Sequence, residues 1–332
     1  MMHAVLRPLD RMRASALKAL GAMAPPLMVR RELRVALWAT TIILLALAGT
    51  ALAPLLMLAI GPIVLGVPHV LADVRYLVVR PGWHRAKRMA PAAVLLVAVG
   101  ATASLELGLL AAAAAVWGAS RARSARTWLV LVCLVVLVAL TAAIGPGDRI
   151  VFAHVHNVVA VVLWWVWMPR RGVGQRVPVL LYLAASAAIA AGLLDGAADS
   201  LAGLVPGALG LERHAAELAP GIGDPWATRL VLLFAFAQAV HYGVWLRLVP
   251  EDDRPRATPR TFRASWDALV SDFGRPALYA TMTLAIGVFA WALVDLAAAR
   301  TGYLRLALFH GHMELAALSL FAAGIGPPTR AR

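Results

Sequence analysis

The sequence predicts an all-α polytopic membrane protein, a transmembrane bundle of about ten helices with both termini cytoplasmic. Hydrophobic residues make up 61% of its 332 residues and charged residues 14%, whereas soluble domains contain about 25% charged residues. The apolar residues form long runs, and most basic residues lie between them. We therefore expect a multi-pass protein of the cell membrane. We expect no nucleic-acid partner despite the formal charge of +14.

The apolar runs define the predicted helices, since roughly 20 residues cross a bilayer. The first two spans form one continuous apolar stretch, which we divide near Pro54. The third and fourth are short, and Glu106 between them indicates either a tight hairpin or one long tilted helix. The predicted spans are residues 35–54, 55–79, 90–104, 106–120, 127–145, 150–168, 177–195, 228–249, 276–298 and 304–325.

Three regions make up the predicted chain. Residues 1–34 are basic and amphipathic, which is typical of a segment on the membrane surface in contact with lipids. Residues 35–325 form a single transmembrane domain, and residues 326–332 form a cytoplasmic tail. No cleavable signal-peptide pattern is visible, because the first long apolar stretch begins late and runs too long.

The distribution of basic residues supports an even number of spans. With a cytoplasmic N-terminus, 25 of the 31 Lys and Arg residues lie in the cytoplasmic segments. An excess of Lys and Arg is typical of cytoplasmic loops, which is known as the positive-inside rule. One span miscounted in the middle of the chain would destroy this asymmetry. The cytoplasmic segments are residues 1–34, 80–89, 121–126, 169–176, 246–275 and 326–332.

Histidines inside the spans are the main functional signal. An ionisable side chain in the bilayer costs on the order of 2 kcal/mol or more, and it is rarely placed there without a function. At about 1.5 Å per residue, the histidines lie roughly 12–20 Å from the cytoplasmic ends of four helices. A single one could serve only to hydrogen-bond neighbouring helices, but four helices at one depth favour a shared site. These residues are His69, His154, His156, His241, His310 and His312.

Two of the helices carry histidines two residues apart, which point about 200° away from each other. Each helix therefore contributes one ligand. By depth we predict His156 and His312 as metal ligands together with His69 and His241. The other members of the two pairs, His154 and His310, are the alternates.

Polar residues near these histidines are predicted to support them. Asp73 follows His69 by four residues, Glu314 follows His310 by four, and Asn157 lies three beyond His154. Metal-bound histidines usually donate their second N–H to a carboxylate or a carbonyl. We predict no catalytic side chain beyond the metal ligands.

Ligands that are all imidazole suit iron, copper or zinc. The single cysteine, Cys133, lies in an apolar run, which disfavours thiolate ligands and disulfides. A site near the middle of the bilayer is reached from the lipid phase, so we expect an apolar small-molecule substrate. Oxidation of such a molecule with O₂ requires a redox metal, which favours Fe(II) and an iron-dependent oxygenase. The alternatives are a haem-binding membrane electron-transfer protein and a proton-coupled transporter with a His/carboxylate relay.

Two segments resemble a known family. GVPHVLAD around His69 and HYG at residues 241–243 are similar to motifs of the Brp/Blh family of integral-membrane β-carotene 15,15′-dioxygenases. The resemblance implies an all-helical membrane fold and iron held by four histidines. It also implies cleavage of the carotenoid β-carotene to retinal, with His69 and His241 as ligands and Asp73 supporting His69. The AHVHN and FHGHME segments lie outside this resemblance.

Overall fold

The chain folds as a bundle of helices. The computed structural model describes residues 2–121, 123–144, 148–167, 173–196, 207–254 and 256–326, and all regular structure within these ranges is helical. A helix occupies each of the ten predicted spans. These helices are α3 (Arg31–Leu52), α4 (Pro54–Asp73), α5 (Ala90–Thr102), α6 (Leu105–Ala119), α7 (Ala125–Ile144), α8 (Asp148–Trp167), α9 (Val173–Ala190), α11 (Trp226–Gly243), α14 (Arg275–Val294) and α15 (Leu296–Ala322).

The length and composition of the described helices fit a membrane protein. Five helical segments are long and apolar enough to cross a bilayer, namely Arg31–Leu52, Pro54–Val79, Ala125–Ala143, Trp226–Asp252 and Arg275–Val294. Shorter apolar helices cover Leu105–Ala119, Ile150–Val166 and Gly174–Ala190. An all-helical bundle with five segments able to cross a membrane is thus observed within the described residues, while ten crossings and cytoplasmic termini remain predictions.

The predicted division at Pro54 is confirmed. Helix α3 ends at Leu52 and α4 begins at Pro54, with Ala53 between them in a non-helical conformation (φ −152°, ψ 58°). Proline suits the first turn of a helix, because its missing N–H would have no helical partner there.

The short third and fourth spans form a hairpin rather than one tilted helix. Ala103 has a left-handed backbone (φ 55°) and ends α5. Ser104 then caps α6, its Oγ accepting a hydrogen bond from the Leu107 N–H at 3.1 Å. The Ser104 hydroxyl also donates to Glu106 at 2.6 Å, so this glutamate belongs to the turn. The chain therefore reverses direction between α5 and α6, as the hairpin alternative predicted.

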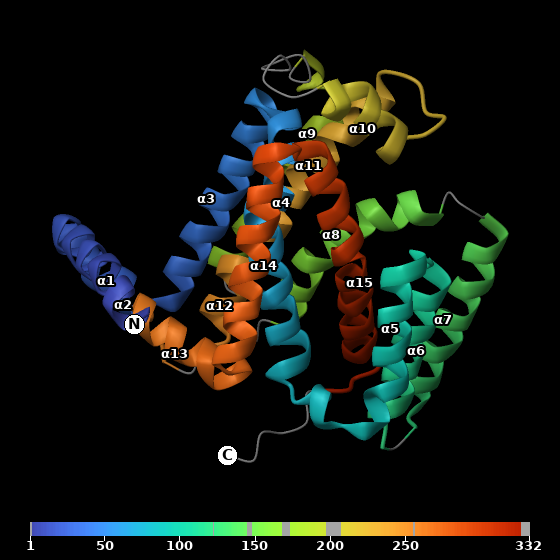
Figure 1. Cartoon of the computed structure of the whole chain (residues 1–332), viewed down its shortest axis with the longest axis horizontal. Helices are drawn as coiled ribbons and strands as arrows, with labels where there is room; N and C mark the ends of the chain where they lie inside the picture. Colours follow the sequence, from blue (N-terminus) through green and yellow to red (C-terminus); the bar gives the residue numbers. More distant parts are fainter. Residues whose placement is uncertain are drawn as a thin grey trace.

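The helices with the predicted site histidines form the centre of the bundle. Helix α15 packs against α4 and α8, and α11 packs against the same two helices (Figure 1). Small residues permit this approach: a Cβ on Gly66 of α4 would lie 2.3 Å from Cζ of Tyr303 in α15. The four helices can therefore bring their side chains to one interior region.

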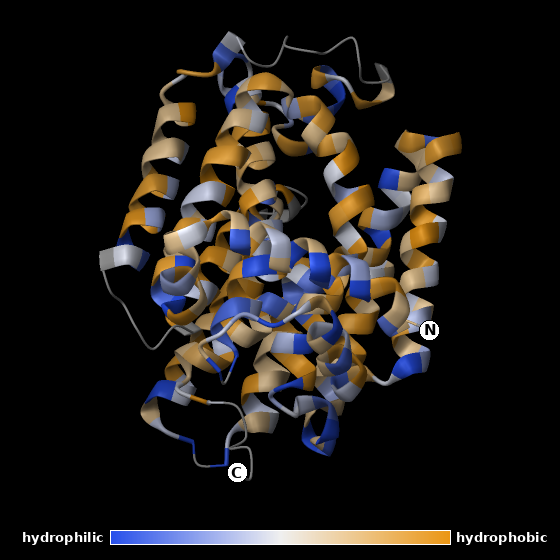
Figure 2. Cartoon of the chain, turned by 90° about the vertical axis from the view of Figure 1, so that its left-hand side faces the viewer, coloured by the Kyte–Doolittle hydropathy of each residue, from blue (hydrophilic) through white to orange (hydrophobic). Residues whose placement is uncertain are grey.

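The amphipathic N-terminal segment packs on another amphipathic helix. Helix α1 (Met2–Ala19) contacts α13 (Phe262–Phe273). The Asp10 carboxylate accepts hydrogen bonds from the Phe262 N–H at 2.6 Å and from Arg263 at 2.7 Å. The Arg263 guanidinium lowers the pKa of Asp10 below its ordinary value. Figure 2 shows hydrophilic residues across the middle and lower part of the view and at its top end, with mainly hydrophobic residues along the long helices between them.

Candidate metal centre

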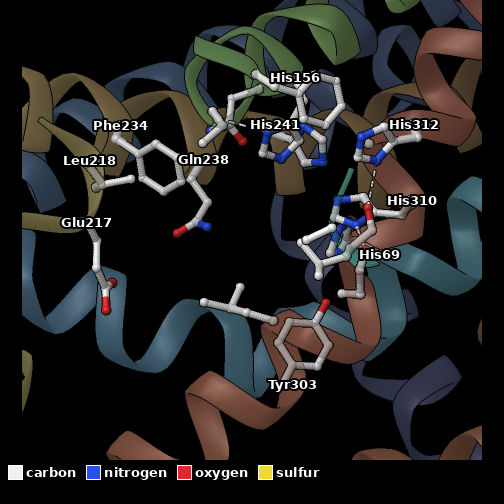
Figure 3. Close-up of a pocket in the computed structure, with 18 of the residues that line it drawn as sticks. His69, His156, Glu217, Leu218, Phe234, Gln238, His241, Tyr303, His310 and His312 are labelled. Atoms are coloured by element: carbon white, nitrogen blue, oxygen red, sulfur yellow. Dashed lines mark hydrogen bonds between the residues drawn. The ribbon is translucent and has the colours of Figure 1, made fainter. Parts of the chain in front are cut away.

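Four imidazoles from four helices meet inside the bundle. His69 comes from α4, His156 from α8, His241 from α11 and His310 from α15 (Figure 3). Their ring centroids are separated by 5.4 Å (His69–His241), 4.8 Å (His69–His310), 5.4 Å (His156–His241), 5.5 Å (His156–His310) and 5.9 Å (His241–His310). The expected common depth thus corresponds to a common location.

Backbone carbonyls fix the protonation of three of these rings. The Nδ1 of His69 lies 3.3 Å from the Leu65 carbonyl oxygen, and that of His156 lies 2.8 Å from the Ala153 carbonyl oxygen. The Nδ1 of His310 makes the same contact with Ala307. A carbonyl can only accept, so Nδ1 carries the proton and Nε2 keeps a free lone pair. This is the arrangement expected of an imidazole that binds a metal through Nε2.

Asp73 lies beside the imidazoles instead of behind one of them. One potential ligand atom each from His69, Asp73, His241 and His310 lies within 4.8 Å of the others. Both oxygens of Asp73 are buried without a hydrogen-bond partner. We expected Asp73 to accept a hydrogen bond from His69, but Nδ1 of His69 uses Leu65 of its own helix. The carboxylate is therefore placed as a further potential ligand.

Glu314 lies against His241, although its position in the sequence paired it with His310. Its Oε1 is 3.5 Å from Nε2 of His241 and accepts a 2.7 Å hydrogen bond from the Trp245 indole. Both carboxylate and imidazole are fully enclosed, with side-chain exposures of 0% and 1%. Trp245 was not predicted to belong to the site. Its signal in the sequence is its spacing, since it follows His241 by four residues on one helix face.

The predicted amide, Asn157, is fully buried and lines the same cavity as the imidazoles. Its Nδ2 donates to the Ala153 carbonyl oxygen of its own helix at 3.3 Å, while Oδ1 has no hydrogen-bond partner. Its hydrogen bond is thus not to His154, the residue from which its position was counted, since His154 contacts Leu218. Ala153 therefore accepts from both Asn157 and His156.

The two remaining histidines of the pairs make other contacts, although the Nδ1 of His312 also lies 3.1 Å from a carbonyl oxygen of its own helix, that of Leu308. The His312 ring stacks on Phe152 at 4.2 Å and packs against Gly108 of α6, where a Cβ would lie 1.8 Å from its Cδ2. The Nε2 of His154 lies 3.0 Å from the carbonyl oxygen of Leu218 in α10 (Leu211–Leu218). The geometry thus favours the alternate His310 over His312. Depth alone suggested His312, but rotation about the helix axis decides which ring faces the others.

Both α4 and α11 change their helical pitch directly after the site. A π-helical segment, Val74–Val79, follows Asp73, and another, Val244–Leu248, follows Gly243. Such wide turns often accompany functional sites, because they rotate the side chains that follow relative to those before. The segment after Gly243 carries Trp245, whose indole reaches Glu314.

A cavity of about 250 Å³ opens beside the imidazoles. All four lie in its wall, together with His312 and apolar residues such as Phe152, Phe234, Leu304 and Leu308. The cavity extends to Glu217 and Leu218 at the end of the bundle that carries α10 (Figure 3). A small molecule in this space would lie directly against the imidazoles.

The residues present fit a bound metal ion. Within the described residues, several polar atoms at the site are buried without a hydrogen-bond partner, namely Nε2 of His69, Nδ1 of His241 and both oxygens of Asp73. Such atoms are costly to bury unless something binds them. Two ligands on opposite sides of an ion with bonds of about 2.1 Å lie about 4.2 Å apart. Among His69, Asp73, His241 and His310, whose ligand atoms lie within 4.8 Å of one another, such a pair would have to approach by about half an ångström. The His156 ring lies beside this group, 5.4 Å from that of His241 and 5.5 Å from that of His310.

The donor set is nitrogen and oxygen. The single cysteine, Cys133, lies exposed on α7, and no sulfur atom lines the cavity. Imidazoles with a carboxylate suit iron, zinc or copper. Comparisons with protein-family models, curated proteins and solved structures found no match to this chain. The interpretation therefore rests on the residues themselves.

Proposed function

We propose that this protein is an integral-membrane, non-haem iron oxygenase that acts with O₂ on an apolar isoprenoid or carotenoid-like substrate from the lipid phase. The observation that carries the proposal is the meeting of His69, His156, His241 and His310, from four helices, at the wall of one largely apolar cavity. Cleavage of β-carotene to retinal is what the resemblance of GVPHVLAD and HYG implies for this site.

The side chains of the site would have three roles: binding the metal, orienting a ligand and binding the substrate. The imidazoles and Asp73 would hold Fe(II), which when bound supplies the redox chemistry that activates O₂. Glu314 would orient His241, and Trp245 in turn holds Glu314 through its indole N–H. The apolar wall would bind the substrate and exclude water from the reacting atoms. No further catalytic side chain is required by this arrangement.

The close spacing of the rings favours non-haem iron over haem. Two axial histidines of a haem face each other across the macrocycle, so the porphyrin must pass between their rings. Here each of the four imidazoles has two others within 5.5 Å, so a porphyrin placed between any two of the rings would overlap the others. The transporter alternative requires no metal, so analysis of bound metal separates it from an oxygenase.

Oxygen consumption by the purified protein tests the proposal. The iron-loaded chain should consume O₂ in the presence of a carotenoid, and coexpression with a carotenoid pathway should bleach the cells. His241→Ala should abolish both effects, because it removes a ligand. His84→Ala should not, because His84 lies on the exposed turn after α4. A Soret band in the purified protein would instead indicate haem, and an iron-loaded protein without O₂ uptake on any apolar substrate would refute the proposal.

A further inference from the structure

Polar side chains in the cavity remain without a role in the proposed chemistry. Gln238 of α11 and Tyr303 of α15 line the cavity among the apolar residues. Both residues are buried, with exposed fractions of 8% and 3%. Neither is a candidate metal ligand, so another function must explain a carboxamide and a phenol in an apolar space.

Neither group is satisfied by the protein. Within the described residues, the Gln238 amide makes no hydrogen bond, and Figure 3 shows it pointing into the cavity between Glu217 and the imidazoles. The Tyr303 hydroxyl is buried with no hydrogen-bond partner. Buried polar groups are unfavourable unless they are hydrogen-bonded. The buried phenol and an amide that points into the same cavity indicate that a ligand supplies their hydrogen-bond partners.

Helical spacing places both groups on the same side of the imidazoles. Gln238 precedes His241 by three residues, which is about 4.5 Å along α11, and Tyr303 precedes His310 by seven, about 10 Å along α15. These spacings keep each polar residue near the face of its helix that carries the histidine. The polar groups thus lie between the imidazoles and the end of the cavity near α10.

Ion pairs and a backbone carbonyl engage the charges at that end, where Glu217 lies between Arg300 and Arg213. Arg300 donates from Nε to the Leu58 carbonyl oxygen at 2.9 Å, and its Nη1 lies 3.6 Å from a carboxylate oxygen of Glu217. A guanidinium already engaged with a carboxylate offers little attraction to a second anion. The groups left for a ligand are therefore neutral, and both an amide and a phenol can donate and accept hydrogen bonds.

We propose that Gln238 and Tyr303 bind a neutral oxygen group, a hydroxyl or a carbonyl, on an otherwise apolar substrate. The inference rests on the proposed function in that this cavity holds the oxygenase substrate. Held there, the oxygen group lies one to two helical turns from the imidazoles and fixes which part of the carbon chain faces them. The substrate class narrows from a pure hydrocarbon to an oxygenated isoprenoid.

Binding of four related probes to the full chain in lipid nanodiscs tests this assignment. The probes are farnesol, farnesal, farnesoic acid and the hydrocarbon farnesene, each at the same mole fraction in the lipid. We expect the alcohol and the aldehyde to bind about five- to tenfold more tightly than the hydrocarbon, the effect of one net hydrogen bond. Ligand-induced thermal stabilisation measures the difference.

Three variants test which residues cause the preference for the alcohol and the aldehyde over the hydrocarbon. Gln238→Leu should abolish it, and Tyr303→Phe, which removes only the hydroxyl, should reduce it about threefold. Gln175→Leu is the matched control, because Gln175 is also a buried glutamine with an unpartnered oxygen but does not line the cavity. Equal binding of all four probes to the wild type would overturn the inference. So would a preference that survives in both cavity variants, or one for the acid that disappears in Arg300→Gln.

The same experiment separates this inference from the proposed function when it is run on iron-loaded and on chelator-treated protein, with iron measured independently. Bound iron without a preference among the probes refutes the oxygen-group site and leaves the oxygenase proposal standing. A preference that depends on Gln238 in a protein that binds no iron supports the site and refutes the oxygenase.

Discussion

At the scale of single residues, the centre depends on how each imidazole is held. Three rings are fixed by a carbonyl of their own helix, at Leu65, Ala153 and Ala307. His241 differs, since its Nε2 faces Glu314 at 3.5 Å. This histidine is therefore the one whose orientation depends on another helix, and Glu314 is a positioning residue for it.

Neutralising that carboxylate should weaken metal binding. Glu314→Gln keeps the shape of the side chain but removes the charge near His241, and loss of such an outer partner typically lowers metal affinity about 10–100-fold. Competition with a chelator measures the affinity. Glu217→Gln, at the far end of the cavity, should leave it unchanged, and equal affinities of the wild type and Glu314→Gln would disprove the positioning role.

At the scale of helices, close contacts set the relative positions of the ligands. Gly66 precedes His69 by three residues and admits the Tyr303 ring of α15. In Gly66→Ala, the new Cβ would lie 2.3 Å from Tyr303, so the Tyr303 ring or the two helices must shift. We expect a loss of about 1–3 kcal/mol in stability, together with reduced iron content. The matched control is Gly100→Ala on α5, where a Cβ meets no atom within 4 Å; equal melting temperatures of the two variants would contradict the packing account.

Helix α10 covers the other end of the cavity and should respond to pH. His214 of this helix is fully buried, and burial, followed by the positive charge of Arg300, lowers its pKa. When α10 detaches, the pKa returns toward about 6.5, so detachment takes up a proton. Docking of α10 should therefore be strongest above this value and weaken as the pH falls below it.

Hydrogen exchange of the α10 amides, corrected for the intrinsic pH dependence, measures this docking. Protection should fall between about pH 7.5 and pH 5 in the wild type, across the ordinary histidine pKa of about 6.5. It should stay constant in His214→Gln, which cannot take up the proton. Protection of the wild type that is unaffected by acid would show that His214 does not control the docking.

At the scale of the whole molecule, the sequence predicts where the helices lie along the chain. It does not predict how each helix is rotated about its own axis. The apolar runs predict the positions of all ten helices. The position of each histidine within its run predicts that the histidines of four helices lie at a similar depth in the membrane. The choice between His310 and His312 required the rotation of α15 about its axis, which a depth argument does not contain. The contact between Trp245 and Glu314 was missed for a related reason, because the spacing of Trp245 from His241 does not show which residue of another helix its indole reaches.

The central claim is that four helices bind one metal ion, and metal analysis of single variants tests it most directly. The purified wild type should contain about one iron per chain. His69→Ala, His156→Ala, His241→Ala and His310→Ala should each lose it, whereas His154→Ala and His312→Ala should retain it. A wild type without metal, or loss of iron in His312→Ala with retention in His310→Ala, would contradict the account.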